Sequence, residues 1–406
     1  MSAPRVLNID DLRRLARRRL PAVVFDYIDG GAEDEITLAE NRRAFRDVTF
    51  RPRQGVAVSS GDLRTTVLGT TFELPFLLAP LGFCRMFYPR GEAVAARAAH
   101  AAGTGYILST FSGMRLEEVR AAAPGALWYQ LYVAGGRAAA EAAIARARAA
   151  GYSALVVTID TPVAGMRERD VRRGAGPLLA GRFWASLPHT WQFAVRPGWV
   201  LRYLADGAVR AFPNVVLPDG VPMPCRDVSV LLERALVTWR DLAWIRDAWR
   251  GPLVVKGIHT GEAARQAVEA GADAVVVSNH GGRQLDGVAA SLRALPEVAA
   301  AVGSRAEVLM DGGIRRGADI AKALCLGARA VLIGRAYAWG LAAAGGPGVA
   351  RVIDILRADL VRTLKLLGCA STADLDRTFV EVPPQWTAGA VAWSRRGAEG
   401  RCDDTS

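Results

Sequence analysis

The 406-residue sequence predicts an α/β protein, and within that class a (β/α)8 or TIM barrel with an N-terminal helical segment and a long insertion after the fourth strand. Short, nearly continuous apolar segments recur along the chain, and alanine-rich amphipathic segments separate most of them. Continuous apolar runs are typical of parallel strands, because such strands are buried on both faces of the sheet. We therefore expect a single domain over residues 1–406 with the barrel at about 70–370, and an open doubly wound sheet is the alternative.

The expected elements alternate in order along the chain. The strands are Leu74–Ala79, Gly105–Ser109, Leu127–Leu131, Ala154–Ile159, Leu253–Lys256, Ala274–Ser278, Glu307–Asp311 and Ala330–Gly334. The helices are Glu92–Ala102, Leu116–Ala123, Arg137–Ala150, Gly261–Ala270, Ser291–Val302 and Arg316–Leu326. Glycines such as Gly103 and Gly151 follow several helices, where turns from helix to strand favour a residue without a side chain. Before the barrel, we expect helices at Ile9–Arg19 and Pro21–Ala32.

Residues 171–238 form the expected insertion, and they are rich in proline, tryptophan and phenylalanine. A connection of this length is usually a lid, a binding loop or a disordered segment. Tryptophans that alternate with arginines would suit a surface lying on an anionic membrane. The residues of this pattern are Trp184, Trp191, Trp199, Arg182, Arg196 and Arg202. We expect either a lid over the barrel or a peripheral membrane contact.

Charge and composition exclude several classes of protein. The net charge is +11, but the arginines are spread through alanine-rich helices and no known nucleic-acid-binding motif is present, so we expect no nucleic-acid partner. No uncharged apolar stretch is long enough to span a bilayer, and the N-terminus lacks a signal-peptide core. The five cysteines are scattered without a CxxC pair, which favours a reduced, cytoplasmic chain without a metal site.

Residues at the expected strand ends can form an active site, because barrel enzymes build their sites there. His280 follows a buried strand in an Asn-His-Gly-Gly-Arg turn, which favours a catalytic base over a structural histidine. Asp160 could hold and charge-stabilise this imidazole, or it could cap a turn. Arg167 and Arg283 could bind a carboxylate together, although each alone is more often a surface residue.

Two further groups of strand-end residues indicate a phosphate-bearing heterocycle. Glycines that let backbone amides approach closely stand beside arginines at the last two strands, in Gly312, Gly313 and Arg315 and in Gly334 and Arg335. Either piece alone could be a tight turn. The middle strands end in groups that suit a flat ring with several carbonyls and nitrogens, and these are Ser109, Gln130, Thr158 and Lys256. The lysine would stabilise an anionic reduced flavin, or it would pair with a neighbouring carboxylate.

These residues closely resemble the FMN-dependent α-hydroxy-acid oxidising family, which includes glycolate oxidase, L-lactate dehydrogenase and mandelate dehydrogenase. The resemblance runs from about Leu7 to about Gly368; residues 278–286 match the family signature, 311–317 and 333–335 its phosphate site, and 25–27 and 31–35 its N-terminal segment. It implies that His280 is the base and Asp160 its partner. The implied substrate-binding residues are Tyr27, Tyr132, Arg167 and Arg283. The implied FMN-binding residues are Pro80, Leu81, Gly82, Ser109, Gln130, Thr158, Lys256, Ser278, Asp311, Gly312, Gly313, Arg315, Gly334 and Arg335.

The resemblance implies FMN-dependent oxidation of a lactate- or mandelate-like L-2-hydroxy acid to the 2-oxo acid, with electrons passed to quinone or another carrier. Gly82 favours an acceptor other than oxygen, since the family's oxidases tend to carry alanine there. Phe111 and Ala164 stand where the family varies its substrate pocket, and the small Ala164 leaves room for a side chain larger than methyl. Alternatives are an oxygen-using oxidase that releases peroxide, a mycofactocin-type enzyme acting on a peptide-derived intermediate, and a non-catalytic sensor of a phosphorylated ligand. By analogy we expect a homotetramer, cytoplasmic or peripheral on the inner face of the cell membrane.

Overall fold

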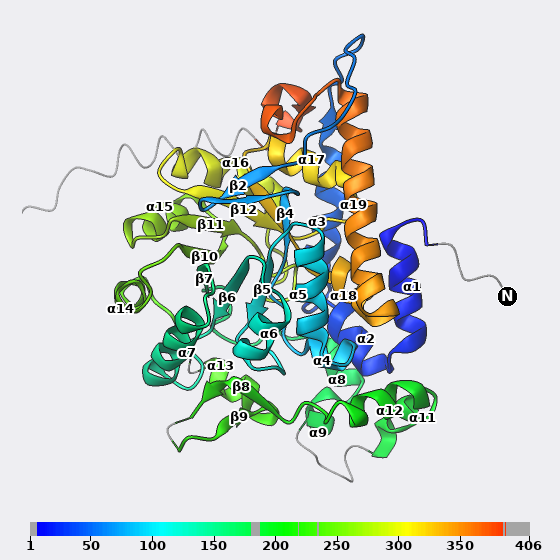
Figure 1. Ribbon diagram of the computed structural model, residues 1–406, viewed down its shortest axis with the longest axis vertical. Coiled ribbons are helices and arrows are strands. Elements are labelled where there is room, and N and C mark those ends of the chain that lie inside the picture. The colour runs from blue at the N-terminus through cyan, green and yellow to red at the C-terminus, as the bar shows by residue number, and fades with distance from the viewer. Residues whose placement is uncertain (1–5, 180–186, 218, 234, 385, 387–406) are drawn as a thin grey trace, which may run out of the picture.

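Eight parallel strands close into a barrel in the computed structural model, which describes residues 6–179, 187–217, 219–233, 235–384 and 386 (Figure 1). Around the barrel the strands run in the order β4, β5, β6, β7, β10, β11, β12 and β13. Their bounds are Phe76–Leu78, Tyr106–Ser109, Leu127–Leu131, Ala154–Thr158, Leu253–Ile258, Ala274–Val277, Glu307–Asp311 and Ala330–Ile333. The predicted barrel is confirmed, and every predicted strand overlaps an observed one.

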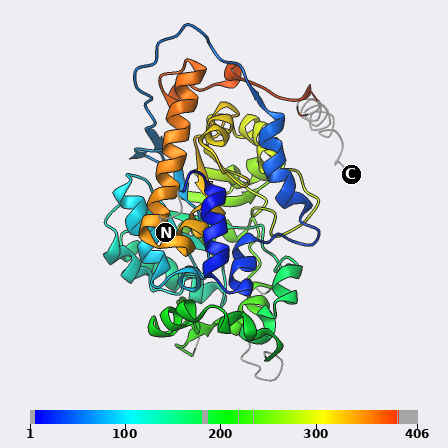
Figure 2. The same ribbon diagram turned by 90° about the vertical axis from the view of Figure 1, so that its right-hand side faces the viewer.

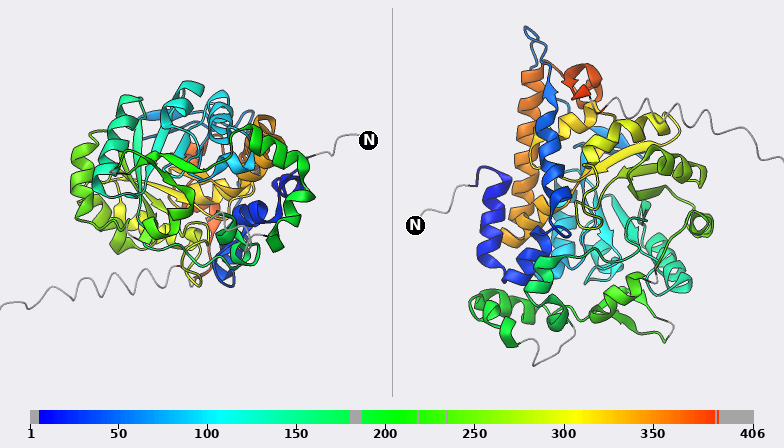
Figure 3. Two further views of the ribbon diagram at one scale, coloured as in Figure 1. Left: turned by 90° about the horizontal axis from the view of Figure 1, so that it is seen from below. Right: turned by 180° about the vertical axis from the view of Figure 1, so that it is seen from behind.

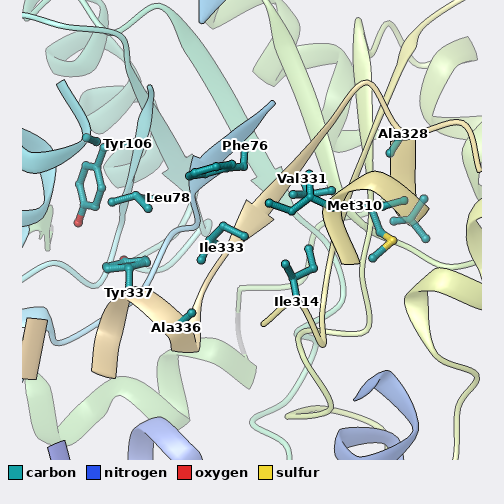
Figure 4. Close-up of a cluster of buried hydrophobic side chains, with 14 of the residues drawn as sticks. Phe76, Leu78, Tyr106, Met310, Ile314, Ala328, Val331, Ile333, Ala336 and Tyr337 are labelled. Carbon is teal, nitrogen blue, oxygen red and sulfur yellow. The ribbon is translucent and has the colours of Figure 1, made fainter. Parts of the chain in front are cut away.

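Both faces of the barrel sheet are buried, which explains the continuous apolar runs. Leu77, Trp128 and Val254 pack inside the barrel, in one apolar cluster. Their neighbours Phe76 and Leu78 point outward into a larger cluster between the sheet and the helices (Figure 4). Because successive residues of a strand face opposite sides, a strand enclosed in this way has no position for an exposed polar residue.

Helices surround the barrel, and they follow the predicted ones closely. They are α5 (Gly91–Ala101), α6 (Leu116–Ala122), α7 (Arg137–Ala149), α14 (Asp241–Ala248), α15 (Gly261–Glu269), α16 (Ser291–Val302), α17 (Gly317–Cys325), α18 (Arg335–Ala344) and α19 (Gly346–Leu367). The sequence did not predict α14, α18 or α19, although Leu242 and Ile245 on α14 are fully buried. The long α19 packs against α17 and α18 (Figure 2).

The N-terminal helices lie outside the barrel and reach its loops. They are α1 (Ile9–Arg19), α2 (Ala22–Asp29) and α3 (Ile36–Asp47). The side chain of Asn8 caps α1 by accepting a hydrogen bond from the amide of Asp11. The carboxylate of Asp286 accepts hydrogen bonds from the amides of Ile36 and Thr37 at 3.1 and 2.7 Å, so the last residue of the signature holds the first turn of α3.

Short strands and short helices outside the barrel sheet complete the fold. The hairpin of β2 (Thr65–Val67) and β3 (Thr70–Phe72) contributes Val67 and Phe72 to the interior cluster. Strand β1 (Thr49–Phe50) pairs with β14 (Val380–Glu381) in an antiparallel ladder. The remaining short helices are α4 (Cys84–Phe87), η3 (Thr372–Asp374) and η4 (Arg377–Phe379).

The insertion between β7 and β10 is folded and docked on the barrel at one end of the molecule (Figure 3). It contains α8 (Glu168–Arg172), α9 (Ala175–Leu179), η1 (Leu187–His189), α11 (Trp191–Ala194), α12 (Pro197–Ala205), the hairpin β8 (Ala211–Val216) and β9 (Pro222–Pro224), η2 (Cys225–Asp227) and α13 (Val228–Glu233). The indole of Trp199 donates to the carbonyl of Met86 at 2.8 Å, and Arg85 pairs with Asp206 at 2.7 Å. Trp199 therefore anchors the insertion instead of facing outward with Trp191.

Three expectations from the sequence can be compared with the structure only within the described residues. Arg182 and Trp184 lie outside the described residues, as does Cys402. The other cysteines, Cys84, Cys225, Cys325 and Cys369, are free and buried. Among the described helices, none combines the length and the apolar character needed to cross a bilayer.

Candidate active site

A single cavity at the carboxyl ends of the barrel strands collects nearly all the predicted site residues. The predicted residues that line it are Tyr27, Pro80, Leu81, Gly82, Ser109, Gln130, Tyr132, Thr158, Arg167, Lys256, His280, Arg283, Asp311, Gly312, Gly313, Arg315, Gly334 and Arg335. Two predicted residues, Asp160 and Ser278, are not part of the lining and stand directly behind it, bonded to His280. The strands thus bring together side chains that are up to 308 positions apart in sequence, from Tyr27 to Arg335.

His280 and Asp160 form a hydrogen-bonded pair at the edge of the cavity. His280 Nδ1 lies 2.9 Å from Asp160 Oδ1, and the backbone amide of His280 donates to Ser278 Oγ at 3.0 Å. The residue has a φ of +56°, a left-handed conformation that costs energy for any residue with a side chain. Residues 281 and 282 are also left-handed, and both are glycine. This strained backbone conformation directs the imidazole of His280 toward Asp160.

Asp160 is ionised in this arrangement. Burial raises the pKa of its carboxyl group, but the nearby charges of His280 and Lys256 outweigh burial and lower the pKa to about 2. A carboxylate at Nδ1 fixes the orientation of the ring and stabilises positive charge on it. Within the described residues, Nε2 of His280 has no hydrogen-bond partner, and the ring lines the cavity. This is the geometry of a base whose far nitrogen faces a ligand.

Two guanidinium groups flank the histidine. Arg283 donates to the carbonyls of Tyr27 and Gly30 at 2.7 and 3.1 Å, and it lies over the Tyr27 ring at 5.0 Å from the centroid. Burial lowers the pKa of Arg283, and the positive charge of Arg167 lowers it further. Arg167 is held by Asp170, with 2.9 Å between Nε and Oδ2. An anion bound between the two guanidinium groups would relieve their mutual repulsion.

Two phenols and one hydroxyl complete this end of the cavity. Burial raises the pKa values of Tyr27 and Tyr132, so both hydroxyls stay protonated and can donate hydrogen bonds. Thr161 Oγ1 lies 3.4 Å from the Tyr132 hydroxyl and 3.1 Å from Asp160 Oδ1, and it connects the two groups. Thr161 was not predicted as a site residue, although it follows Asp160 directly at the end of a strand.

The middle of the cavity has polar atoms suited to a flavin ring. Buried atoms without a hydrogen-bond partner in the described part of the chain include Gln130 Nε2, Thr158 Oγ1 and Asp311 Oδ1. Lys256 Nζ donates to Ser278 Oγ at 3.0 Å and lies 3.2 Å from Asp311 Oδ2. Burial lowers the pKa of this lysine, but Asp311 and Asp160 raise it above its ordinary value. Lys256 therefore pairs with a neighbouring carboxylate, as one of the two expectations for this lysine stated. It also places a fixed positive charge in the cavity.

The last two strand ends form an anion-binding corner. Arg335 donates to the carbonyls of Gly281 and Gly30, both at 2.8 Å. Burial lowers the pKa of Arg335, and burial together with Arg42 lowers that of Arg315 to about 10. No carboxylate of the described residues pairs with either guanidinium group. Largely enclosed guanidinium groups without a carboxylate partner favour a bound anion, and a phosphate at this position in the barrel would supply it.

A glycine in the same corner permits a close backbone approach. Gly313 has a φ of +78°, and a Cβ added there would lie 1.9 Å from the carbonyl oxygen of Asn41 on α3. Only glycine allows the loop after β12 to pack against α3 and present its amides to the corner. The donor set of the cavity thus fits FMN along its whole length: polar atoms and a cation in the middle, and glycines with arginines at the end.

Apolar residues form the outer wall of the cavity near His280. They include Phe83, Phe87, Phe111, Ala164, Val228 and Leu232. Phe111 stacks on Tyr132, with the ring centroids 5.0 Å apart. Phe111 and Ala164 were predicted from the sequence, whereas the other four residues were not. Phe83 could have been predicted, because it follows the first strand closely. Val228 and Leu232 come from α13 of the insertion, and no sequence pattern indicated where this helix lies.

The fold and the site together define an α/β-barrel flavoprotein with a histidine–aspartate pair beside two arginines. The FMN-dependent dehydrogenase family matches residues 16–382, and the chain belongs to this family, whose cofactor is FMN. The chain is 45% identical over 379 residues to an L-lactate dehydrogenase of Caulobacter vibrioides (strain NA1000 / CB15N), covering 92% of this chain and 97% of that one. It is 44% identical over 380 residues to an L-lactate oxidase of Nostoc sp. (strain PCC 7120 / SAG 25.82 / UTEX 2576), covering 93% and 98%.

Solved structures agree with the fold. A structure described as the monotopic membrane protein (S)-mandelate dehydrogenase superposes with a TM-score of 0.84 at 37% identity, covering 93% of this chain and 100% of that one. A mandelate oxidase structure superposes with a TM-score of 0.77 at 35% identity, covering 93% and 98%. Both relatives by sequence and neighbours by structure include dehydrogenases and oxidases of 2-hydroxy acids.

Proposed function

We propose that the protein oxidises an L-2-hydroxy acid to the 2-oxo acid with FMN as cofactor. The observation that supports this best is the histidine–aspartate pair beside two partly buried guanidinium groups in one cavity. A 2-hydroxy acid matches both parts of this site. Its carboxylate can bind the two guanidinium groups, and its hydroxyl-bearing carbon can lie beside the histidine–aspartate pair. The matching relatives act, by their names, on lactate and mandelate, which are both of this class.

The proposed roles follow from charge and geometry. Arg167 and Arg283 bind the substrate carboxylate, and the protonated hydroxyls of Tyr27 and Tyr132 bind its oxygens. His280 takes a proton from the substrate at Nε2. The ionised Asp160 then stabilises the imidazolium, because the charge develops within 2.9 Å of a carboxylate oxygen. Bound FMN would supply the redox chemistry, since it can take up the two electrons and the second proton that the substrate loses and so reach its anionic reduced form.

The remaining predicted residues hold the cofactor in this proposal. Lys256 supplies a positive charge beside the ring, which favours the reduced, negatively charged form. Arg315 and Arg335 bind the phosphate together with the amides of Gly312 and Gly313. The other proposed contacts are Pro80, Leu81, Gly82, Ser109, Gln130, Thr158, Ser278, Asp311 and Gly334.

We propose quinone or another carrier as the electron acceptor, with the protein peripheral on the inner face of the cell membrane. Trp191, Leu201 and Leu204 on α11 and α12 are 58%, 69% and 62% exposed, which supports contact between this end of the molecule and lipid. One structural neighbour is described as a monotopic membrane protein. Oxygen is the second candidate acceptor, since a relative of 44% identity is an oxidase. A homo-oligomer remains part of the proposal by analogy.

Anaerobic mixing of the holoenzyme with a panel of L-2-hydroxy acids tests the reaction directly. We expect the flavin absorbance to bleach with at least one of them, and His280→Gln to abolish bleaching while the cofactor stays bound. His100→Gln is the matched control, because His100 is exposed on α5 and far from the cavity. Absence of bleaching with every hydroxy acid would reject the proposed reaction. Reoxidation of the bleached enzyme by a soluble quinone or by oxygen then separates the two acceptors.

A further inference from the structure

A second cavity lies outside the active site, where α1, α2 and α11 meet. Its volume is about 430 Å³. Five arginines line it, namely Arg14, Arg17, Arg18, Arg173 and Arg196. Its apolar lining consists of Leu20, Ala22, Phe25, Trp191 and Val195. None of these residues has a part in the proposed reaction, so the concentration of guanidinium groups here needs its own explanation.

The positive charge of this cavity is only partly compensated. Arg14 pairs with Asp11, and Arg173 pairs with Asp26 at 3.0 Å. Within the described part of the chain, the other three arginines have no carboxylate partner, so three positive charges remain in excess. The carboxyl end of α1 adds only about half a negative charge. The excess therefore suits a ligand that carries a negative charge of its own.

Arg196 lacks a hydrogen-bond partner for one donor atom as well as a carboxylate partner for its charge. Arg196 donates to the carbonyl of Val195 at 2.9 Å, but its Nε atom is buried and has no partner among the described atoms. Arg17 contacts only the face of Phe25, at 6.0 Å from the ring centroid, among the interactions of the described residues. Guanidinium groups in this state bind phosphate oxygens well, since each offers several planar donors.

The cavity has fixed walls. The side-chain oxygen of Gln192 on α11 accepts from the amide of Val23 on α2 at 2.6 Å, and its Nε2 donates to the carbonyl of His189 at 2.8 Å. Gln192 is itself buried, so α11 cannot move away from α2 without leaving these groups unpaired. The arginines of α1 and those of the insertion are therefore held on opposite sides of one space.

The apolar part of the lining selects among anions. Phe25 and Leu20 form a buried floor, whereas Trp191 and Val195 are more than half exposed at the rim. Leu201 and Leu204 on the neighbouring α12 are also more than half exposed, and both helices lie at the same end of the molecule (Figures 1 and 3). A ligand with a phosphate and an attached apolar chain matches this layout, with the phosphate at the arginines and the chain along the rim.

We propose that this cavity binds the phosphate of an anionic phospholipid head group. The inference rests on the proposed membrane contact and makes it specific: the exposed leucines enter the lipid surface, and the cavity selects membranes that carry negative charge. The site would orient the barrel mouth, which the same insertion covers, toward the membrane that contains the carrier.

Flotation of the full-length holoenzyme with lipid vesicles tests the proposal. Wild-type protein should bind vesicles that contain phosphatidylglycerol more tightly than vesicles of phosphatidylcholine alone. Arg17→Gln combined with Arg18→Gln should weaken binding to the anionic vesicles about 30-fold, at the usual contribution of an arginine near an anionic surface. Arg250→Gln combined with Arg265→Gln removes the same charge from exposed positions elsewhere and should leave binding unchanged.

A variant that keeps the net charge distinguishes binding in the cavity from general electrostatic attraction to an anionic membrane. Ala22→Trp should fill the space between the arginines and Phe25 and remove the preference for anionic vesicles, while flavin absorbance and turnover with a soluble dye report that the protein is intact. If Ala22→Trp or the Arg17–Arg18 variant keeps the full preference, the head-group site does not exist. Calorimetric binding of inorganic phosphate without any vesicle binding would overturn the lipid in favour of a soluble anion. Flotation with equal affinity for both vesicles would reject the site but keep the membrane contact, and dye turnover reports separately on the reaction.

Discussion

Replacement of Asp160 by asparagine tests how the histidine is activated. The ordinary pKa of the carboxyl group is 3.8, and the neighbouring His280 and Lys256 lower it to about 2 in the folded protein. A difference of this size corresponds to about 2 kcal/mol of favourable interaction with the ionised carboxylate. The group is largely buried, so solvent does not screen this interaction strongly. Loss of the charge removes this stabilisation when the imidazole becomes protonated.

We therefore expect Asp160→Asn to slow flavin reduction between about 10-fold and about 30-fold, the larger value applying if His280 contributes most of the interaction. Rapid anaerobic mixing with a saturating 2-hydroxy acid measures this rate. Substrate affinity should change little, because Arg167 and Arg283, which we propose to bind the substrate carboxylate, are not bonded to Asp160. Asp170→Asn is the matched control: it releases Arg167, to which Asp170 is paired at 2.9 Å, and should weaken substrate binding more than it slows reduction. An unchanged reduction rate in Asp160→Asn would refute this account of the pair.

Three other substitutions have outcomes that the structure determines. Gly313→Ala should yield protein without FMN or without a stable fold, since its Cβ would collide with backbone, whereas Gly303→Ala, also at positive φ but with open space, should keep FMN; absorbance of the purified proteins decides this. Glu92→Gln should raise the melting temperature by an amount that grows as pH rises above about 4.5, because burial raises the pKa of Glu92 and its ionised form destabilises the fold; melting curves at several pH values check the sign. Gly82→Ala should fold and bind FMN but raise the KM for mandelate more than for lactate, since the new methyl would lie 3.3 Å from the Phe111 Cβ; steady-state kinetics with both acids would contradict this if the two KM values changed alike.

The wild-type carboxylate of Asp160 also has a consequence for stability. Its pKa is lower in the folded chain than in the unfolded chain, so the ionised group stabilises the fold above about pH 4. This contribution is lost as the pH falls through about 2. The difference in free energy of unfolding between wild type and Asp160→Asn should therefore shrink over this range, as acid titrations of unfolding would show.

Most of the barrel could be predicted from the chain because local patterns report on it directly. A strand enclosed on both faces must be apolar at every position, as in Ala274–Val277, and a turn that needs a left-handed residue usually contains glycine. The insertion could not be predicted in the same way. Its helices are short, and their positions depend on contacts such as the one from Trp199 to the Met86 carbonyl, which lie 113 residues apart.

The site likewise has features that follow from the sequence and features that depend on the tertiary structure. The order of residues determined which groups stand at the strand ends, and hence the proposed base, the cations and the glycines, because each follows its own strand by a fixed number of residues. Only the tertiary structure decided that Asp160 reaches Nδ1 of His280, that Thr161 connects it to Tyr132, and that α13 closes the cavity. It also placed the arginines of α1 opposite Arg196 across a second cavity. The physical reason is that these contacts join segments far apart in the chain, and their distances follow from packing of the whole molecule and not from any local pattern.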